Sequence, residues 1–88
     1  MSIVESKVLS WPVDLDEYVW NSIEDVTLMM RLYNNVPLDV IASELWKTTN
    51  AVQIRRKQIA KQLFKNGRTL KNISTILRLT EDELKNIL

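Results

Sequence analysis

The sequence predicts an all-α fold of about five helices, and three observations support this class. The 88 residues include one glycine and two prolines, so few positions interrupt a helix. Apolar residues recur at spacings of three and four, which is the period of an amphipathic helix. Two stretches share one pattern of apolar residues and helix caps, which indicates an internal repeat. A chain of this length is expected to form a single domain, residues 1–88.

An N-terminal arm, residues 1–19, is expected to precede the helices. It contains Pro12 and has weak periodicity, so a mostly irregular path is predicted, with room for a short helical turn at residues 14–19. The arm is too apolar for a free tail, and we therefore expect it to pack on the domain. The apolar residues behind this expectation are Ile3, Val4, Val8, Leu9, Trp11 and Val13.

The first helix is expected to begin near Ser22, because Ser22 and Asp25 have the spacing of a capping box. The stretch "NNVP" ends this helix, since Pro37 disfavours a helical residue before it. The predicted buried face consists of residues at helical spacing, namely Val26, Met29, Met30 and Tyr33.

A second helix is predicted over residues 38–45 and a long third helix over about 50–66. Thr48 or Thr49 is the expected N-cap of the third helix, and Gly67 is its expected C-terminal stop. The residues expected to face the core are Leu38, Ile41, Ala42 and Leu45 on the second helix, and Val52, Arg56, Ile59 and Leu63 on the third. Residues 20–66 are therefore predicted to form a three-helix helix-turn-helix unit.

Residues 67–88 are predicted to form a second helix-turn-helix-like pair, with helices at 69–77 and 81–88. This pair repeats the preceding unit at an offset of 32 and shares the long third helix with it. Thr80 and Glu83 again have capping-box spacing. The matched positions are Leu38 with Leu70, Ile41 with Ile73, Ala42 with Ser74, Leu45 with Leu77, Thr48 with Thr80 and Val52 with Leu84. The lead-ins "LYNN" and "LFKNG" correspond if one residue is inserted.

Charge is divided unevenly along the chain. Residues 1–46 carry a net charge of −6 and residues 47–88 a net charge of +7, although the whole chain has only +1. Nine cations and no acid lie between Lys47 and Arg78. An asymmetry of this kind favours an anionic partner for the basic half, and mutual neutralisation of the two halves is the alternative.

Catalytic and metal-binding roles are not expected. The sequence has no cysteine and no histidine, which removes the thiolate ligands, the commonest metal ligand and the usual general base. We therefore predict that the chain is not an enzyme and has no cofactor and no small-molecule substrate. No apolar run approaches the ~20 residues of a membrane span, so an intracellular, soluble protein is expected.

The segment from Trp20 resembles the Myb/SANT-like class of helix-turn-helix domains. The features that carry this resemblance are Trp20 five residues before Asp25, the "ED" pair, "LYNN", "IASEL" and "KTTNAV…R", in that order. They cover about 40 of the 88 residues, roughly residues 20–60. The resemblance implies that the tryptophan packs in a three-helix core and that the third helix enters the major groove of double-stranded DNA. It implies a regulatory or architectural role, although some members of this class bind proteins instead.

A recognition helix reads base edges with its N-terminal residues and contacts phosphates with flanking cations. The amides of Asn50 and Gln53 can pair with adenine, and Ile54 can contact a thymine methyl group. The predicted DNA-binding residues are Lys47, Thr49, Asn50, Gln53, Ile54, Arg56, Lys57 and Lys61. Lys65 is a further candidate for a phosphate contact.

Several of these residues have a structural alternative. One of Arg55 and Arg56 can pair with Glu24 or Asp25 at the start of the first helix, and Ile54 can lie under the arm. The tryptophans Trp11, Trp20 and Trp46 are expected to pack in the core or against the arm. The alternative function is a protein-interaction module that uses residues 69–88 to bind a transcription or replication protein or a second copy of the chain.

Overall fold

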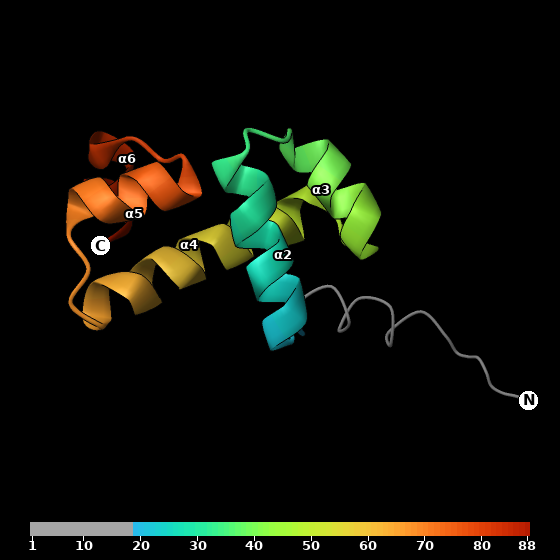
Figure 1. Ribbon diagram of the computed structural model, residues 1–88, viewed down its shortest axis with the longest axis horizontal. Coiled ribbons are helices and arrows are strands. Elements are labelled where there is room, and N and C mark those ends of the chain that lie inside the picture. Colours follow the sequence, from blue (N-terminus) through green and yellow to red (C-terminus); the bar gives the residue numbers. More distant parts are fainter. Residues whose placement is uncertain (1–18) are drawn as a thin grey trace, which may run out of the picture.

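The computed structural model describes residues 19–88, which form five α-helices (Figure 1). The helices are α2 (Ser22–Tyr33), α3 (Leu38–Leu45), α4 (Thr49–Lys65), α5 (Leu70–Leu77) and α6 (Glu81–Ile87). No strand occurs within residues 19–88, and the predicted all-α class is confirmed. The expectations for the arm that concern residues 1–18 lie outside the described residues.

Helix α2 begins at a capping box that lies one residue before the predicted one. Asn21 is the N-cap: its Oδ1 accepts from the Glu24 N–H at 2.8 Å, and the Glu24 Oε1 accepts from the Asn21 N–H at 3.1 Å. The predicted Ser22–Asp25 box is therefore wrong. Asparagine caps as well as serine does, and the carboxylate of Asp25 is occupied by Arg55 of α4.

The repeat is present in the backbone at the same offset of 32. Asn35 and Gly67 have φ angles of 62° and 93°, and Trp46 and Arg78 have φ angles of 58° and 56°. These four are the positive-φ residues of the described chain, and they form two pairs that are 32 residues apart. The C-caps Asn34 and Asn66 differ by the same number, so the lead-ins align without the inserted residue that the sequence comparison suggested.

Helix α4 is common to both repeat units. It packs against α3, α5 and α6, whereas α2 packs against α3 and α5 (Figure 1). A single buried cluster runs through all five helices, and Val52, Ile59 and Ala60 are its members from α4. The long helix therefore closes the first unit and opens the second, as the repeat predicts.

Helix α2 contributes Leu28 and Leu32 to the core. This differs from the predicted buried face, because Val26, Met30 and Tyr33 are each at least half exposed and only Met29 packs against the core. Both sets of residues have helical spacing, so the period alone does not distinguish them. The apolar stripe predicted for α2 exists, but most of it faces outward.

Trp46 ends α3 in the left-handed conformation and does not lie in the core. Its side chain is 93% exposed, so the expected place in the core is wrong. The alternative for Trp46, packing against the arm, concerns residues outside those described, as does the expectation for Trp11. A left-handed backbone costs a residue with a Cβ roughly 1 kcal/mol or more, which is why glycine is favoured at such a position. Trp20, in contrast, packs against the core as the resemblance implies.

Candidate nucleic-acid interface

The candidate interface is built on α4, whose 17 residues contain five cations and no acid. The helix begins at Thr48, whose hydroxyl oxygen accepts from the Ala51 N–H at 3.1 Å. The helix starts at Thr49, one residue before the predicted start at Asn50. Of the two candidate N-caps, Thr48 and Thr49, the structure has Thr48. The cap leaves Thr49 and Asn50 exposed in the first turn.

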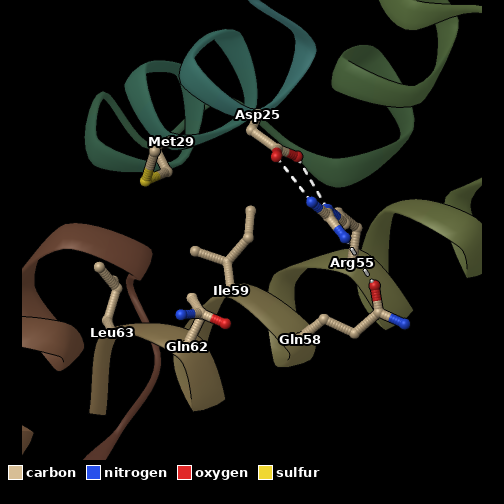
Figure 2. A pocket seen from close by; sticks show the side chains of 7 residues that line it. All are labelled: Asp25, Met29, Arg55, Gln58, Ile59, Gln62 and Leu63. Carbon is tan, nitrogen blue, oxygen red and sulfur yellow. Dashed lines mark hydrogen bonds and ion pairs between the residues drawn. The ribbon is translucent and has the colours of Figure 1, made fainter. Parts of the chain in front are cut away.

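Arg55 points inward and binds Asp25 (Figure 2). Its Nε donates to Oδ1 at 2.8 Å and its Nη2 to Oδ2 at 2.6 Å, while Nη1 donates to the Gln58 Oε1 at 3.0 Å. The hydrogen bonds and charge of Asp25 raise the pKa of Arg55, against an opposing effect of burial. Of the pairings considered for Arg55 and Arg56 with Glu24 and Asp25, the structure therefore contains Arg55 with Asp25.

Arg56 donates hydrogen bonds to the C-terminal end of α5. Its Nε donates to the Leu77 carbonyl oxygen at 3.0 Å and its Nη2 to the carbonyl oxygen of Arg78. Desolvation lowers the pKa of Arg56, and the nearby carboxylate of Glu83 opposes that shift. This guanidinium satisfies carbonyl groups that a helix end leaves without partners. Arg56 is a predicted phosphate contact, and the structure directs its charge toward α5.

Lys47 is also held within the protein. Its side chain is only 7% exposed, and Nζ donates to the Val19 carbonyl oxygen at 2.9 Å. Nζ lies 3.6 Å from the Glu24 Oε2 and 5.3 Å from the centre of the Trp20 ring. Lys47 therefore fixes the chain that enters α2, and it is not displayed toward solvent as a predicted phosphate contact would be.

Arg78 has a role that the sequence did not indicate. Its Nε and Nη2 both donate to the Tyr33 carbonyl oxygen, at 3.1 and 2.8 Å, and its guanidinium lies 5.2 Å from the centre of the Tyr33 ring. The C-terminal end of α2 is thus tied to the turn after α5. The acceptor is a main-chain carbonyl 45 residues away, for which a sequence carries no signal.

One row of residues on the outer side of α4 is defined here as the α4 outer stripe, which consists of Asn50, Ile54, Lys57, Lys61 and Lys65. Thr49, Gln58, Gln62 and Phe64 are also exposed on α4 but are not members of this row. Successive members are four, three, four and four residues apart, so they share one side of the helix. The three lysines are exposed and Ile54 is partly buried. Four of the eight predicted DNA-binding residues belong to this stripe.

Thr49 and Gln53 lie beside the α4 outer stripe, toward α6. Gln53 is partly buried and accepts from the Nη1 of Arg56 at 3.4 Å. A hollow of about 210 Å³ lies here, and its lining includes Gln53, Lys57 and Glu83. The carboxylate of Glu83 therefore reduces the positive potential on this flank of the stripe, and on the opposite flank Asp25 neutralises Arg55.

A larger hollow, of about 490 Å³, lies between α2 and α4 on the side that carries the Arg55–Asp25 pair (Figure 2). Met29 of α2 lies across the hollow from Ile59 and Leu63 of α4, and Gln58 and Gln62, also of α4, add uncharged polar groups to its lining. Its two charged groups are Arg55 and Asp25, which neutralise each other. The hollow thus offers no net charge to an ionic ligand.

Comparisons with known proteins add no family. No family model, no curated protein and no solved structure matches this chain. Within residues 19–88, no helix is long and apolar enough to cross a membrane. In the same residues, no three acidic, histidine or cysteine side chains come together as metal ligands would. The candidate interface is thus defined by the geometry and charge of α4.

Proposed function

We propose that this protein binds double-stranded DNA with the α4 outer stripe in the major groove, in a regulatory or architectural role. The observation that carries the proposal is an exposed helix face with lysines at every turn of its second half and no acid in the helix. Such a face matches the phosphate charge of a duplex, and an α-helix fits the width of the major groove.

The proposed contacts divide α4 along its length. Asn50 and Gln53, near its N-terminal end, would pair with base edges, adenine above all, and Ile54 would contact a thymine methyl group. Lys57 and Lys61 would contact phosphates and supply affinity that does not depend on sequence. Because Arg56 and Lys47 are bound to other parts of the protein, we leave them out of the proposed interface.

The Myb/SANT-like resemblance of residues 20–60 supports the same proposal, since it assigns the groove-reading role to the same helix. The second repeat unit supports it by contrast. Its helix α6 occupies the position that the N-terminal part of α4 holds in the first unit, but it begins with Glu81, Asp82 and Glu83. Three carboxylates would repel a phosphate backbone, so α6 is proposed to support α4 and not to read DNA.

The decisive experiment measures binding to random duplex DNA over a series of salt concentrations. We expect affinity to fall steeply with salt, and the salt slope to decrease by about one for each of Lys57→Ala and Lys61→Ala. Lys85→Ala, which removes an exposed lysine from α6, is the matched control and leaves the slope unchanged. Absence of binding at low salt, or equal slopes for all three variants, rejects the proposal.

Sequence preference is tested separately by selection from a random duplex library. Asn50→Ala is expected to relax the preference at one base pair while it keeps the salt slope, because an amide contact carries information and little charge. If the selected sequences are the same for the wild type and for Asn50→Ala, Asn50 does not read a base.

A further inference from the structure

Helix α2 carries a row of exposed apolar side chains on the side that faces away from the core. This row is defined here as the α2 outer stripe and consists of Ile23, Val26, Met30 and Tyr33, which are 76%, 50%, 53% and 51% exposed. Their spacings are three, four and three. Val19, four residues before Ile23 and 65% exposed, continues the pattern into the chain that enters the helix.

The same helix is apolar on its opposite side, where Leu28 and Leu32 are buried. A helix that is apolar on two sides is expected to be covered on both, whereas a helix at a protein surface has one apolar side and one polar side. Within residues 19–88 the other helices bury the side of Leu28 and Leu32, and on the α2 outer stripe Arg78 contacts the Tyr33 ring. The α2 outer stripe therefore has the pattern of an interface that no other helix of residues 19–88 buries.

The spacing of the stripe indicates that the partner is another helix. Alternating steps of three and four residues form the seam of a helix pair, in which side chains of one helix fit between those of the other. The positions that border the stripe are uncharged: Ser22 and Met29 lie along one edge, and Thr27 and Asn34 along the other. The guanidinium of Arg78 lies 5.2 Å from the centre of the Tyr33 ring, at the C-terminal end of the stripe. The border beside Val26 and Met30 is uncharged, and it lets two identical helices approach without repulsion.

We infer that the α2 outer stripe of one protein packs against the same stripe of a second copy, as an antiparallel pair related by a two-fold axis. In this arrangement Ile23 faces Tyr33 of the other copy and Val26 faces Met30, so every member of the stripe meets an apolar residue. The antiparallel direction also opposes the two helix dipoles and separates the two acidic first turns, which contain Glu24 and Asp25.

The contact involves one 12-residue helix from each copy, which is smaller than a standard protein interface. Association is therefore expected to be reversible and to depend on concentration. The surface differs from residues 69–88, where the sequence placed a possible self-association site. It uses α2 and leaves the lysines of the α4 outer stripe free, so it does not depend on the proposed DNA binding.

The test is sedimentation of the full chain from about 10 μM to about 1 mM, the range in which a small contact dissociates. We expect the molar mass of the wild type to rise from that of a monomer to that of a dimer as concentration increases. The double variant Val26→Lys, Met30→Lys is expected to remain a monomer. Phe64→Lys is the matched control: Phe64 is 49% exposed, lies on α4, and its replacement leaves the dimer intact. Circular dichroism confirms that each variant keeps its helices. A wild type that remains monomeric throughout, or a double variant that still dimerises, overturns the inference.

Disulfide formation tests the direction of the pair, because the natural sequence has no cysteine. A mixture of Val26→Cys and Met30→Cys proteins is expected to form mixed disulfides faster than either protein alone forms its own. Phe64→Cys provides the background rate. Faster formation by Val26→Cys alone than by the mixture overturns the antiparallel arrangement.

Discussion

Arg55 and Asp25 are thirty residues apart in sequence and form a two-point pair in the structure, with nitrogen–oxygen distances of 2.8 and 2.6 Å. Two parallel hydrogen bonds between a guanidinium and a carboxylate fix distance and orientation together. The pair joins the first turn of α2 to the middle of α4 (Figure 2). It thus sets where α2 crosses the helix that carries the candidate interface.

Loss of this pair is expected to destabilise the fold. Arg55→Ala should lower the free energy of unfolding by about 1–2 kcal/mol, since the bonds involve charged groups but the side chains are 28% and 22% exposed. Urea unfolding measures the change, and Lys57→Ala on the exposed face should stay within about 0.5 kcal/mol of the wild type. Equal effects of the two substitutions would contradict the structural role of Arg55.

Glycine should act differently at the two matched left-handed positions. Trp46→Gly is expected to raise the free energy of unfolding by about 1 kcal/mol, because it removes the cost of a left-handed backbone and loses few contacts from a 93% exposed side chain. Arg78→Gly removes the same cost but also both hydrogen bonds to the Tyr33 carbonyl oxygen, so it should give no gain. Thermal unfolding measures the stability of both variants. A similar gain in stability for both would show that the hydrogen bonds from Arg78 to the Tyr33 carbonyl oxygen do not stabilise the fold.

Stability should depend on pH through Glu83. Hydrogen bonds with Thr80 lower the pKa of Glu83, and the largest effect comes from the bond that the Thr80 backbone N–H donates. The charge of Arg56 lowers this pKa further. A carboxyl whose pKa is lower in the folded state stabilises the protein above its unfolded pKa, near 4.5, and this contribution is lost as pH falls through the folded pKa. Glu83→Gln should therefore be less stable than the wild type at pH 7, and the difference should narrow below about pH 4.5.

The control for this pH series is Glu81→Gln. It removes an acid from the same first turn but not from the capping box. Unfolding curves at several pH values should show the narrowing for Glu83→Gln and a smaller change for Glu81→Gln. The pH series ends at about 3, below the usual pKa range of glutamate. If the difference in unfolding free energy between wild type and Glu83→Gln stays constant from pH 7 to about pH 3, the capping carboxylate of Glu83 does not stabilise the fold.

Two substitutions on α2 test which of its sides is in the core. Leu28→Ala should cost about 2–5 kcal/mol of unfolding free energy, because Leu28 is fully buried and a cavity remains. Val26→Ala, at a side chain that is half exposed, should cost less than about 1 kcal/mol. Chemical unfolding at low protein concentration, where the α2 outer stripe is unpaired, gives both values, and the reverse order would contradict the placement of α2.

Features that depend on a few neighbouring residues were predictable from the sequence. The bounds of α3, the end of α4 before Gly67 and the capping box of Thr80 with Glu83 all follow from local hydrogen bonds and backbone conformations. The inner side of α2 was not predictable in this way. Two apolar stripes on one helix have the same period, and only the packing of α3 and α5 decides which is buried.

The sequence also could not predict which cations are exposed and which are bound within the protein. Lys47 and Lys57 are the same residue type in the same basic stretch, yet one is enclosed by Val19, Glu24 and Trp20 and the other is exposed. The difference arises from where the chain before α2 returns to the turn after α3. The pattern of charge predicted a basic helix. The structure shows that two of the eight predicted DNA-binding residues, Lys47 and Arg56, instead donate hydrogen bonds to main-chain carbonyl groups of the protein.

Because α4 is one uninterrupted helix that belongs to both repeat units, its length fixes the rotation of one unit relative to the other. Each residue of an α-helix turns the chain by about 100° and advances it by about 1.5 Å. A single residue inserted in the middle of α4 would therefore swing α5 and α6 about a quarter of a turn around the first unit. It would separate Arg56 from the end of α5 and Arg78 from the end of α2 together. Length changes should thus be rejected in the longest helix of this protein.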